Sequence, residues 1–212
     1  AEVRWGVAGQ ALLHIALIPD PAASASGRSI ELRALSADDG RELGRARIPD
    51  AHSLQVLRYD EQQGRVMLLT QPEAFDHVAW YNLVSGEQTG AFPAEGVGEA
   101  ALSPDGRYLL AEQFPDTGTV LALYDLNGHS APRVWQHPAD AHSVYHRWSP
   151  DGRYVAYMLR EGSTFAAEST RGLGVWVLDI ETMQAQRILE DESLASLLVG
   201  WTPDSAYLLG YH

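Results

Sequence analysis

Two short stretches of the chain carry residue types that could do chemistry, and they repeat each other. Asp50 and His52 belong to an Asp-Ala-His-Ser tetrapeptide, and Asp140 and His142 belong to a second copy of it. A carboxylate close to an imidazole can bind a cation or attract a basic segment of a partner. Asp and Ser also close turns with their own side chains, so a local structural role is the alternative for both copies.

The stretch 160–172 is the most distinctive segment of the sequence, an irregular connection of thirteen residues between two expected strands. It carries one aromatic residue, Phe165, between polar flanks. Long connections between strands are often functional. We therefore expect Phe165, Glu168 and Arg171 to contact a partner. A surface excursion without a function is the alternative.

Motifs of known enzymes are missing from the sequence. There is no Gly-x-Ser-x-Gly elbow, no His-Glu-x-x-His and no glycine-rich phosphate loop. His142 and His146 have a spacing that suits a metal on a helix, but in a strand it separates them by about 13 Å. We expect no catalytic residue, no metal ligand and no cofactor.

Composition excludes several classes of partner. The net charge is −13, and all fifteen cationic side chains are arginine, which argues against a nucleic-acid surface. Cysteine is absent, so the chain forms no disulfide and has no thiol nucleophile. No apolar run approaches the ~20 residues that a membrane-spanning helix needs, so we expect no membrane insertion.

The elements that would position these residues are repeated hairpins. Ser-Pro-Asp-Gly-Arg-Tyr occurs at 103–108 and at 149–154, each time between two apolar runs, and Thr-Pro-Asp-Ser follows at 202–205. Pro, Asp and Gly in this order favour a tight turn. Because the aspartates of these turns recur, we interpret them as structural and not as catalytic. The turn positions that align across the chain are Gly9, Gly64, Gly106, Gly152 and Ser205, spaced by 55, 42, 46 and 53 residues.

Such spacings are typical of propeller blades, which repeat at roughly 40–50 residues. Each repeat is predicted to form four strands, and the tight turn joins the first strand to the second. The sequence therefore predicts an all-β propeller of four-stranded antiparallel blades, with four complete units and a partial fifth. The units form one domain or a propeller fragment over 1–212, with approximate bounds 1–50, 51–94, 95–139, 140–192 and 193–212. We expect the recurrent aromatic residues Trp5, Trp148, Trp201, Tyr108, Tyr154 and Tyr207 to pack between blades.

The turns at 103–108 and 149–154, each followed by a strand that ends near Tyr-Asp-Leu or Leu-Asp-Ile, resemble those of TolB-type and WD-repeat-like β-propellers. In that fold the loops before the first strand and after the second strand of each blade share one face. The resemblance therefore implies an acidic rim on one face, formed by Asp50, His52, Glu95, Asp140, His142, Glu190, Asp191 and Glu192. The stretch 160–172 would lie on the same face, which would thus hold all the predicted partner contacts. Those contacts are Asp50, His52, Glu95, Asp140, His142, Phe165, Glu168, Arg171 and Asp191.

Together these observations favour a non-catalytic binding or scaffold module for a protein or peptide partner. The acidic rim would suit a basic partner. One alternative is the gating propeller of a larger prolyl-oligopeptidase-like serine peptidase, since those propellers carry similar turns. Another is a propeller that binds a metal or a small ligand. Because the fifth unit lacks two strands, we expect missing sequence or another chain to complete the ring. The absent cysteines, the start at Ala1 and the resemblance favour an extracytoplasmic location.

Overall fold

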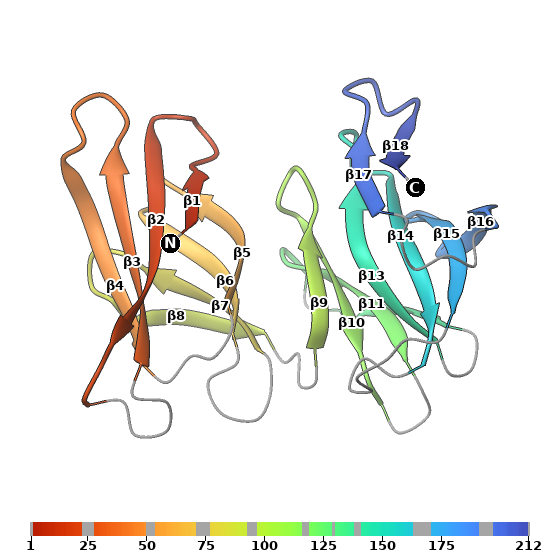
Figure 1. The fold of residues 1–212 in the computed structure, drawn as a ribbon, viewed down its shortest axis with the longest axis horizontal. Helices are drawn as coiled ribbons and strands as arrows, with labels where there is room; N and C mark the ends of the chain where they lie inside the picture. The colour runs from red at the N-terminus through yellow and green to blue at the C-terminus, as the bar shows by residue number, and fades with distance from the viewer. Residues whose placement is uncertain are drawn as a thin grey trace. The chain divides into compact units, whose positions relative to one another are not determined.

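The computed structural model describes residues 2–22, 28–49, 54–70, 77–92, 97–115, 119–128, 130–137, 141–162, 171–190 and 197–211. All regular structure in these residues is β-strand, in four-stranded antiparallel sheets and one two-stranded sheet (Figure 1). The predicted fold class, four complete four-stranded units and a partial fifth, is confirmed. The described residues contain no helix that is long and apolar enough to cross a membrane.

The chain divides into two compact units, Ala1–Glu95 and Gly96–His212. The first unit contains two sheets, each in sequential strand order. The first sheet consists of β1 (Glu2–Trp5), β2 (Ala11–Pro19), β3 (Arg28–Ser36) and β4 (Glu42–Pro49). The second sheet consists of β5 (Leu54–Asp60), β6 (Arg65–Thr70), β7 (His77–Asn82) and β8 (Gln88–Phe92).

The second unit contains two further sheets and a C-terminal hairpin. The third sheet consists of β9 (Val97–Leu102), β10 (Tyr108–Gln113), β11 (Val120–Asp125) and β12 (Arg133–Gln136). The fourth sheet consists of β13 (Ala141–Trp148), β14 (Tyr154–Glu161), β15 (Gly172–Asp179) and β16 (Gln184–Leu189). The hairpin consists of β17 (Leu197–Trp201) and β18 (Leu208–Tyr211).

The turns that join the first two strands of each unit share one backbone conformation. The φ angles of Gly9, Gly64, Gly106 and Gly152 lie between 60° and 74°, and Ser205 has a φ of 60°. Glycine reaches this left-handed region without steric cost, whereas serine adopts it less readily. Ser205 therefore adopts the conformation of the turn although it stands where the other units have glycine. The predicted alignment of the five turn positions is confirmed.

The Ser-Pro-Asp-Gly turns are stabilised by the serine and aspartate side chains. Ser149 donates its hydroxyl to Asp151 Oδ1 at 2.6 Å, and its oxygen accepts the backbone N–H of Tyr154 at 2.9 Å. The hydrogen bond from Ser149 is the main reason why the pKa of Asp151 lies below its ordinary value. Thr202 and Asp204 make the same contacts in the hairpin. The structural interpretation of the repeated aspartates is confirmed.

The sheets pack face to face through apolar residues at alternate strand positions. In the first unit, Leu13 and Leu32 of the first sheet and Val66 and Leu68 of the second sheet belong to one buried cluster. In the second unit, Leu121 and Leu123 of the third sheet pack in one cluster with Tyr157 and Leu178 of the fourth. The other face of the fourth sheet packs against the hairpin through Val175, Met158 and Leu198. Each face of a sheet therefore needs a neighbour to remove it from water.

Two tryptophans connect neighbouring sheets by hydrogen bonds as well as by packing. Trp148 donates its indole N–H to the carbonyl of Ala101 at 3.1 Å, and Trp201 donates to the carbonyl of Arg147 at 2.9 Å. The ring of Tyr154 stacks on Trp201. Packing between blades is thus confirmed for these residues. It does not hold for Trp5 and Tyr207, whose side chains are 64% and 68% exposed.

The strands of the fourth sheet are long at both ends. The stretch 160–172 is less irregular than expected, because Arg160 pairs with Gly172 and the N–H of Glu161 donates to the carbonyl of Arg171. The last strand, β16, begins at Gln184. The tight turn after Asp179 brings the chain back early, so Gln184 already pairs with Asp179.

We expect Ser149→Ala to lower the free energy of unfolding by about 1–3 kcal/mol, because the partly buried N–H of Tyr154 loses the buried Ser149 hydroxyl as its acceptor. Urea denaturation followed by tryptophan fluorescence measures this change. Ser85→Ala, in an exposed turn, is the matched control and should stay within about 0.5 kcal/mol of the parent. Equal losses in both variants would contradict the structural role of Ser149.

Candidate functional site

Most of the predicted contact residues lie outside the described residues. These are Asp50, His52, Glu95, Asp140, Phe165, Glu168 and Asp191. The structure therefore places only His142 and Arg171 of that set. Both lie at the same end of the fourth sheet, where β13 and β15 begin and β14 ends.

His142 and Arg171 make local contacts. The imidazole of His142 is buried, and its Nδ1 lies 2.9 Å from the carbonyl oxygen of Gly162 at the end of the neighbouring strand. This contact within one sheet agrees with the structural alternative for the Asp-Ala-His-Ser repeat. Arg171 is exposed, and its Nε lies 3.6 Å from Glu161 Oε2.

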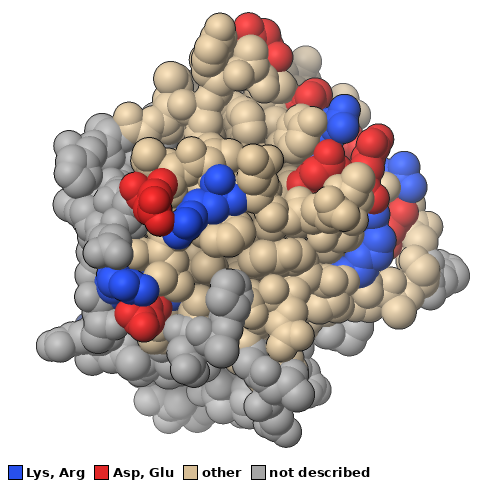
Figure 2. All heavy atoms as spheres, turned by 90° about the vertical axis from the view of Figure 1, so that its right-hand side faces the viewer, with Lys and Arg blue, Asp and Glu red and all other residues tan. Residues whose placement is uncertain are grey.

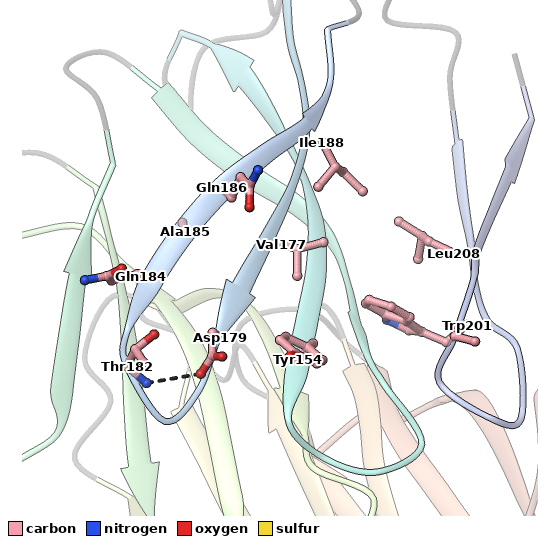
Figure 3. Close-up of a pocket in the computed structure, with 11 residues that line it drawn as sticks. Tyr154, Val177, Asp179, Thr182, Gln184, Ala185, Gln186, Ile188, Trp201 and Leu208 are labelled. Atoms are coloured by element: carbon pink, nitrogen blue, oxygen red, sulfur yellow. Dashed lines mark hydrogen bonds between the residues drawn. The ribbon is translucent and has the colours of Figure 1, made fainter.

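A groove of about 600 Å³ lies between the outer strands of the fourth sheet and the C-terminal hairpin (Figure 3). Figure 3 shows Val177 and Ile188 on the sheet, and Trp201 and Leu208 on the hairpin, pointing into the space between them. The residues that line the groove are Tyr154, Val177, Asp179, Thr182, Gln184, Ala185, Gln186, Ile188, Trp201, Ala206 and Leu208. Apolar side chains form the floor of the groove, and polar groups, among them the amides of Gln184 and Gln186, contribute about half of its exposed lining. Such a mixed lining suits a peptide better than a charged small molecule.

Among the described residues that line the groove, Asp179 carries a carboxylate, and it is already engaged. Asp179 accepts the backbone N–H groups of Glu181 at 2.9 Å and Thr182 at 3.1 Å, and it pairs with Arg153 at 3.3 Å. Desolvation acts to raise the pKa of Asp179, but these hydrogen bonds outweigh it and keep the pKa below its ordinary value. The carboxylate is therefore ionised and structural, and it is not placed to act as a base.

The charged side chains near the groove are also paired. Arg153 engages Asp179, and Arg187 engages Glu190 at 2.9 Å. Figure 2 shows one face of the molecule, on which Arg and acidic side chains lie in small mixed groups with uncharged side chains between them. This part of the described surface thus offers apolar side chains and backbone groups, with its charged side chains already engaged.

A second feature is a polar cluster buried between the third and fourth sheets. Glu112 Oε1 accepts the backbone N–H of Ser143 and also its hydroxyl, the latter at 2.9 Å. The hydroxyl oxygen of Ser143 lies 2.8 Å from His146 Nε2. Because Ser143 donates to Glu112, His146 must donate to Ser143, which assigns the proton of its ring to Nε2.

Ser143 and His146 do not form a catalytic site, although serine, histidine and acid are all present. His146 Nδ1 lies 3.9 Å from Glu99 Oε1, which is too long for a hydrogen bond. Ser143 is fully buried, so no substrate reaches its hydroxyl. In the described part of the chain, no three His, Asp or Glu side chains are grouped so that they could hold a metal ion.

Several buried polar atoms of the cluster lack hydrogen-bond partners. His137 Nε2 lies 3.8 Å from Glu112 Oε1, and neither ring nitrogen of His137 is hydrogen-bonded. Glu112 Oε2, His146 Nδ1 and the hydroxyl of Tyr157 are buried and unpartnered as well. Polar groups without partners are costly in a core, and they make this contact between sheets sensitive to charge.

Burial shifts the pKa values of the cluster toward the neutral forms. Desolvation raises the pKa of Glu112 to about 7, against the hydrogen bonds from Ser143. Desolvation, with His146 and His142 nearby, lowers the pKa of His137 to about 3. Burial also lowers the pKa of His146 and raises that of Tyr157. Near pH 6 the cluster therefore holds a protonated Glu112 beside neutral imidazoles.

Sequence reasoning missed both features. The groove depends on the packing of segments that are distant in sequence, so no local pattern marks it. The cluster had one signal: Glu112 interrupts the apolar run of the second strand of its unit, where the corresponding residue of the fourth unit is Met158. A carboxylate in such a strand indicates a buried polar partner.

Comparisons with known proteins agree with the propeller fold. No protein-family model matches the sequence, and no curated protein matches it. Solved structures do match, at low identity. The β-propeller domain of the trilobed protease from Pyrococcus furiosus, described as having an open velcro topology, gives a TM-score of 0.61 at 11% identity and covers all of this chain. TolB from Acinetobacter baumannii gives 0.58 at 13% identity over 90% of this chain.

An acylaminoacyl peptidase from Pyrococcus horikoshii gives a TM-score of 0.62 at 11% identity over the whole chain. The chain spans 62%, 43% and 35% of the protease propeller, TolB and the peptidase, respectively. At such identities the likeness establishes the class of fold. The chain is a β-propeller protein of the kind found in TolB and in the propellers of these peptidases.

Replacing single members of the buried cluster should change the pH dependence of stability in opposite directions. A raised pKa of Glu112 in the folded state means that its contribution is lost as pH rises from about 4.5 to about 7. A lowered pKa of His137 means that its contribution is lost as pH falls below about 6.5. Between pH 5 and 6.5, Glu112→Gln should therefore steepen the rise of the unfolding free energy with pH, by up to about 1.4 kcal/mol per pH unit.

In the same window, His137→Gln should make that slope shallower by a similar amount. Urea denaturation at several pH values, with all three proteins in the same buffers, measures the slopes. Parallel profiles for the parent and both variants would show that the cluster does not titrate as described.

Proposed function

We propose that this chain is a non-catalytic β-propeller module that binds a protein or peptide partner. The observation that supports it is the groove between the fourth sheet and the C-terminal hairpin, with its apolar floor. Ile188 on the sheet lines the groove and is 50% exposed, and Val177, Trp201 and Leu208 beside it are partly buried. Exposed apolar side chains that gather around a groove mark an interaction surface more often than a single exposed apolar side chain does.

The net charge of −13 supports a partner that is basic outside the groove contact, because charge attraction speeds encounter. We also propose an extracytoplasmic location, which the absence of cysteine and the likeness to TolB support. Cell fractionation with antibodies against the natural protein tests the location.

A second candidate is the propeller of a larger peptidase, where it would control access to a separate catalytic domain. The likeness to the propellers of the acylaminoacyl peptidase and the trilobed protease supports it. A nucleophile elbow in sequence beyond His212 would favour this candidate over the binding module. Hydrolysis of acyl-peptide substrates by the natural full-length protein would do the same.

The binding proposal predicts that ligands selected from a random peptide library will depend on the groove. Ile188→Asp should weaken their binding at least about tenfold, since a charge then faces the apolar floor. Val134→Asp is the matched control: Val134 is 54% exposed on the last strand of the third sheet, outside the groove. Its affinity should stay within about twofold of the parent in isothermal titration calorimetry. Ligands that tolerate Ile188→Asp as well as Val134→Asp would argue against the groove as the binding site.

A further inference from the structure

The contact between the third and fourth sheets buries two histidines that lack hydrogen-bond acceptors for an added proton. Both ring nitrogens of His137 are buried and unpartnered, and the ring makes T-shaped contacts with Trp135 and Tyr157, whose centroids are 4.9 and 5.9 Å away. His146 donates Nε2–H to Ser143, and its Nδ1 is buried and unpartnered as well. A charged imidazole is a donor at both nitrogens, so these surroundings suit only the neutral rings.

The carboxylates of the same contact are better provided with partners. Glu112 Oε1 accepts the N–H and the hydroxyl of Ser143, and the two oxygens of Glu99 accept the N–H groups of Tyr145 and His146. Both carboxylates belong to the third sheet, and all of these donors belong to β13 of the fourth sheet. A negative charge in this contact is thus met by hydrogen bonds that join the two sheets, whereas a positive charge on His137 is not.

Charged and titratable side chains reach the two imidazoles from four strands. They are Glu99 on β9, Glu112 on β10, His142 and Arg147 on β13, and Tyr157 on β14. Burial lowers the pKa of His146, against the charge of Glu99 and together with that of Arg147. Burial is also the main reason why the pKa of His137 falls to about 3, and the other two histidines act in the same direction. The closed contact therefore holds both rings neutral.

Separation of the two sheets at this contact would return His137 and His146 to water, where an imidazole binds a proton below about pH 6.5. A pKa that is lowered in the closed state means that the contact keeps its full stability above about pH 6.5 and loses it as the pH falls. Glu112, whose pKa is raised, acts in the opposite direction between about pH 7 and about pH 4.5. Two imidazoles against one carboxylate leave a net uptake of about one proton when the contact opens in acid.

We propose that the contact between the third and fourth sheets is an acid-sensitive switch, which stays closed near neutral pH and opens locally when His137 and His146 take up protons. Opening breaks the hydrogen bonds that Glu99 and Glu112 accept from β13. The contact between the fourth sheet and the hairpin is built from apolar side chains such as Met158 and Leu198, so mild acid leaves it closed.

Two indole N–H groups report the two contacts separately. Trp148 donates to the carbonyl of Ala101 between the fourth and third sheets, and Trp201 donates to the carbonyl of Arg147 between the hairpin and the fourth sheet. Hydrogen exchange of both groups in the intact protein, measured by NMR and expressed relative to free tryptophan at the same pH, gives the opening equilibrium of each contact. From about pH 6.5 to about pH 4.5, the protection of Trp148 should fall at least about tenfold, and that of Trp201 should change less than about threefold.

Three variants test which groups take up the protons. His137→Gln should reduce the fall at Trp148 to less than about threefold, because Glu112 then offsets the uptake by His146. Glu112→Gln should make the fall steeper than in the parent, since the opposing carboxylate is removed. His14→Gln, the same replacement on β2 of the first unit, is the matched control and should leave the fall unchanged.

Several results would overturn the proposal. Equal losses of protection at Trp148 and Trp201 would mean that acid unfolds the second unit as a whole, and constant protection at Trp148 would mean that the contact does not open. A fall in His137→Gln as large as in the parent would show that another group senses the acid. The comparison of the two indoles in the parent needs no variant, so it decides the question even if His137→Gln does not fold.

Discussion

Face-to-face packing of sheets is the interaction on which this structure depends. Each four-stranded sheet carries apolar side chains on alternate positions of its inner strands, and a neighbouring sheet must cover them. Leu13 and Leu32 are buried because the second sheet lies over them, and Leu123 is buried because the fourth sheet does. The Ser-Pro-Asp-Gly turns and the tryptophan hydrogen bonds keep the strands and sheets in the register that this packing requires.

The fourth sheet shows two departures from fully apolar packing, one on each face. Toward the third sheet, Glu112 and His137 form a buried polar cluster where the other contacts are apolar. Toward the hairpin, the side chains of Val177 and Ile188 line the groove. Because Trp176 and Val177 are neighbours on β15 and face opposite sides, one strand contributes to both regions. A change in the packing of the cluster would thus act on a wall of the groove.

A propeller fold by itself does not define a function, because unrelated activities occur on the same architecture. The comparisons illustrate this, since a TolB protein and two proteins with peptidase or protease names resemble the chain about equally. The case for a binding module therefore depends on the groove, on paired charges such as Arg153 with Asp179, and on the burial of Ser143, which keeps substrate away from its contact with His146.

The sequence by itself determined the all-β class, the number of units and the position of the turns, because these follow from local chemistry. A Pro-Asp-Gly turn between two apolar strands forms wherever it occurs, and even Ser205 preserves its geometry. The acidic rim that the sequence suggested stays a prediction, since most of its residues lie outside the described chain. Only the tertiary structure decided that Trp148 is covered and Trp5 is exposed, that Glu112 meets Ser143, and that Ile188 borders a groove. Each of these depends on which sheet lies next to another, and strand patterns are the same whether or not a neighbour is present.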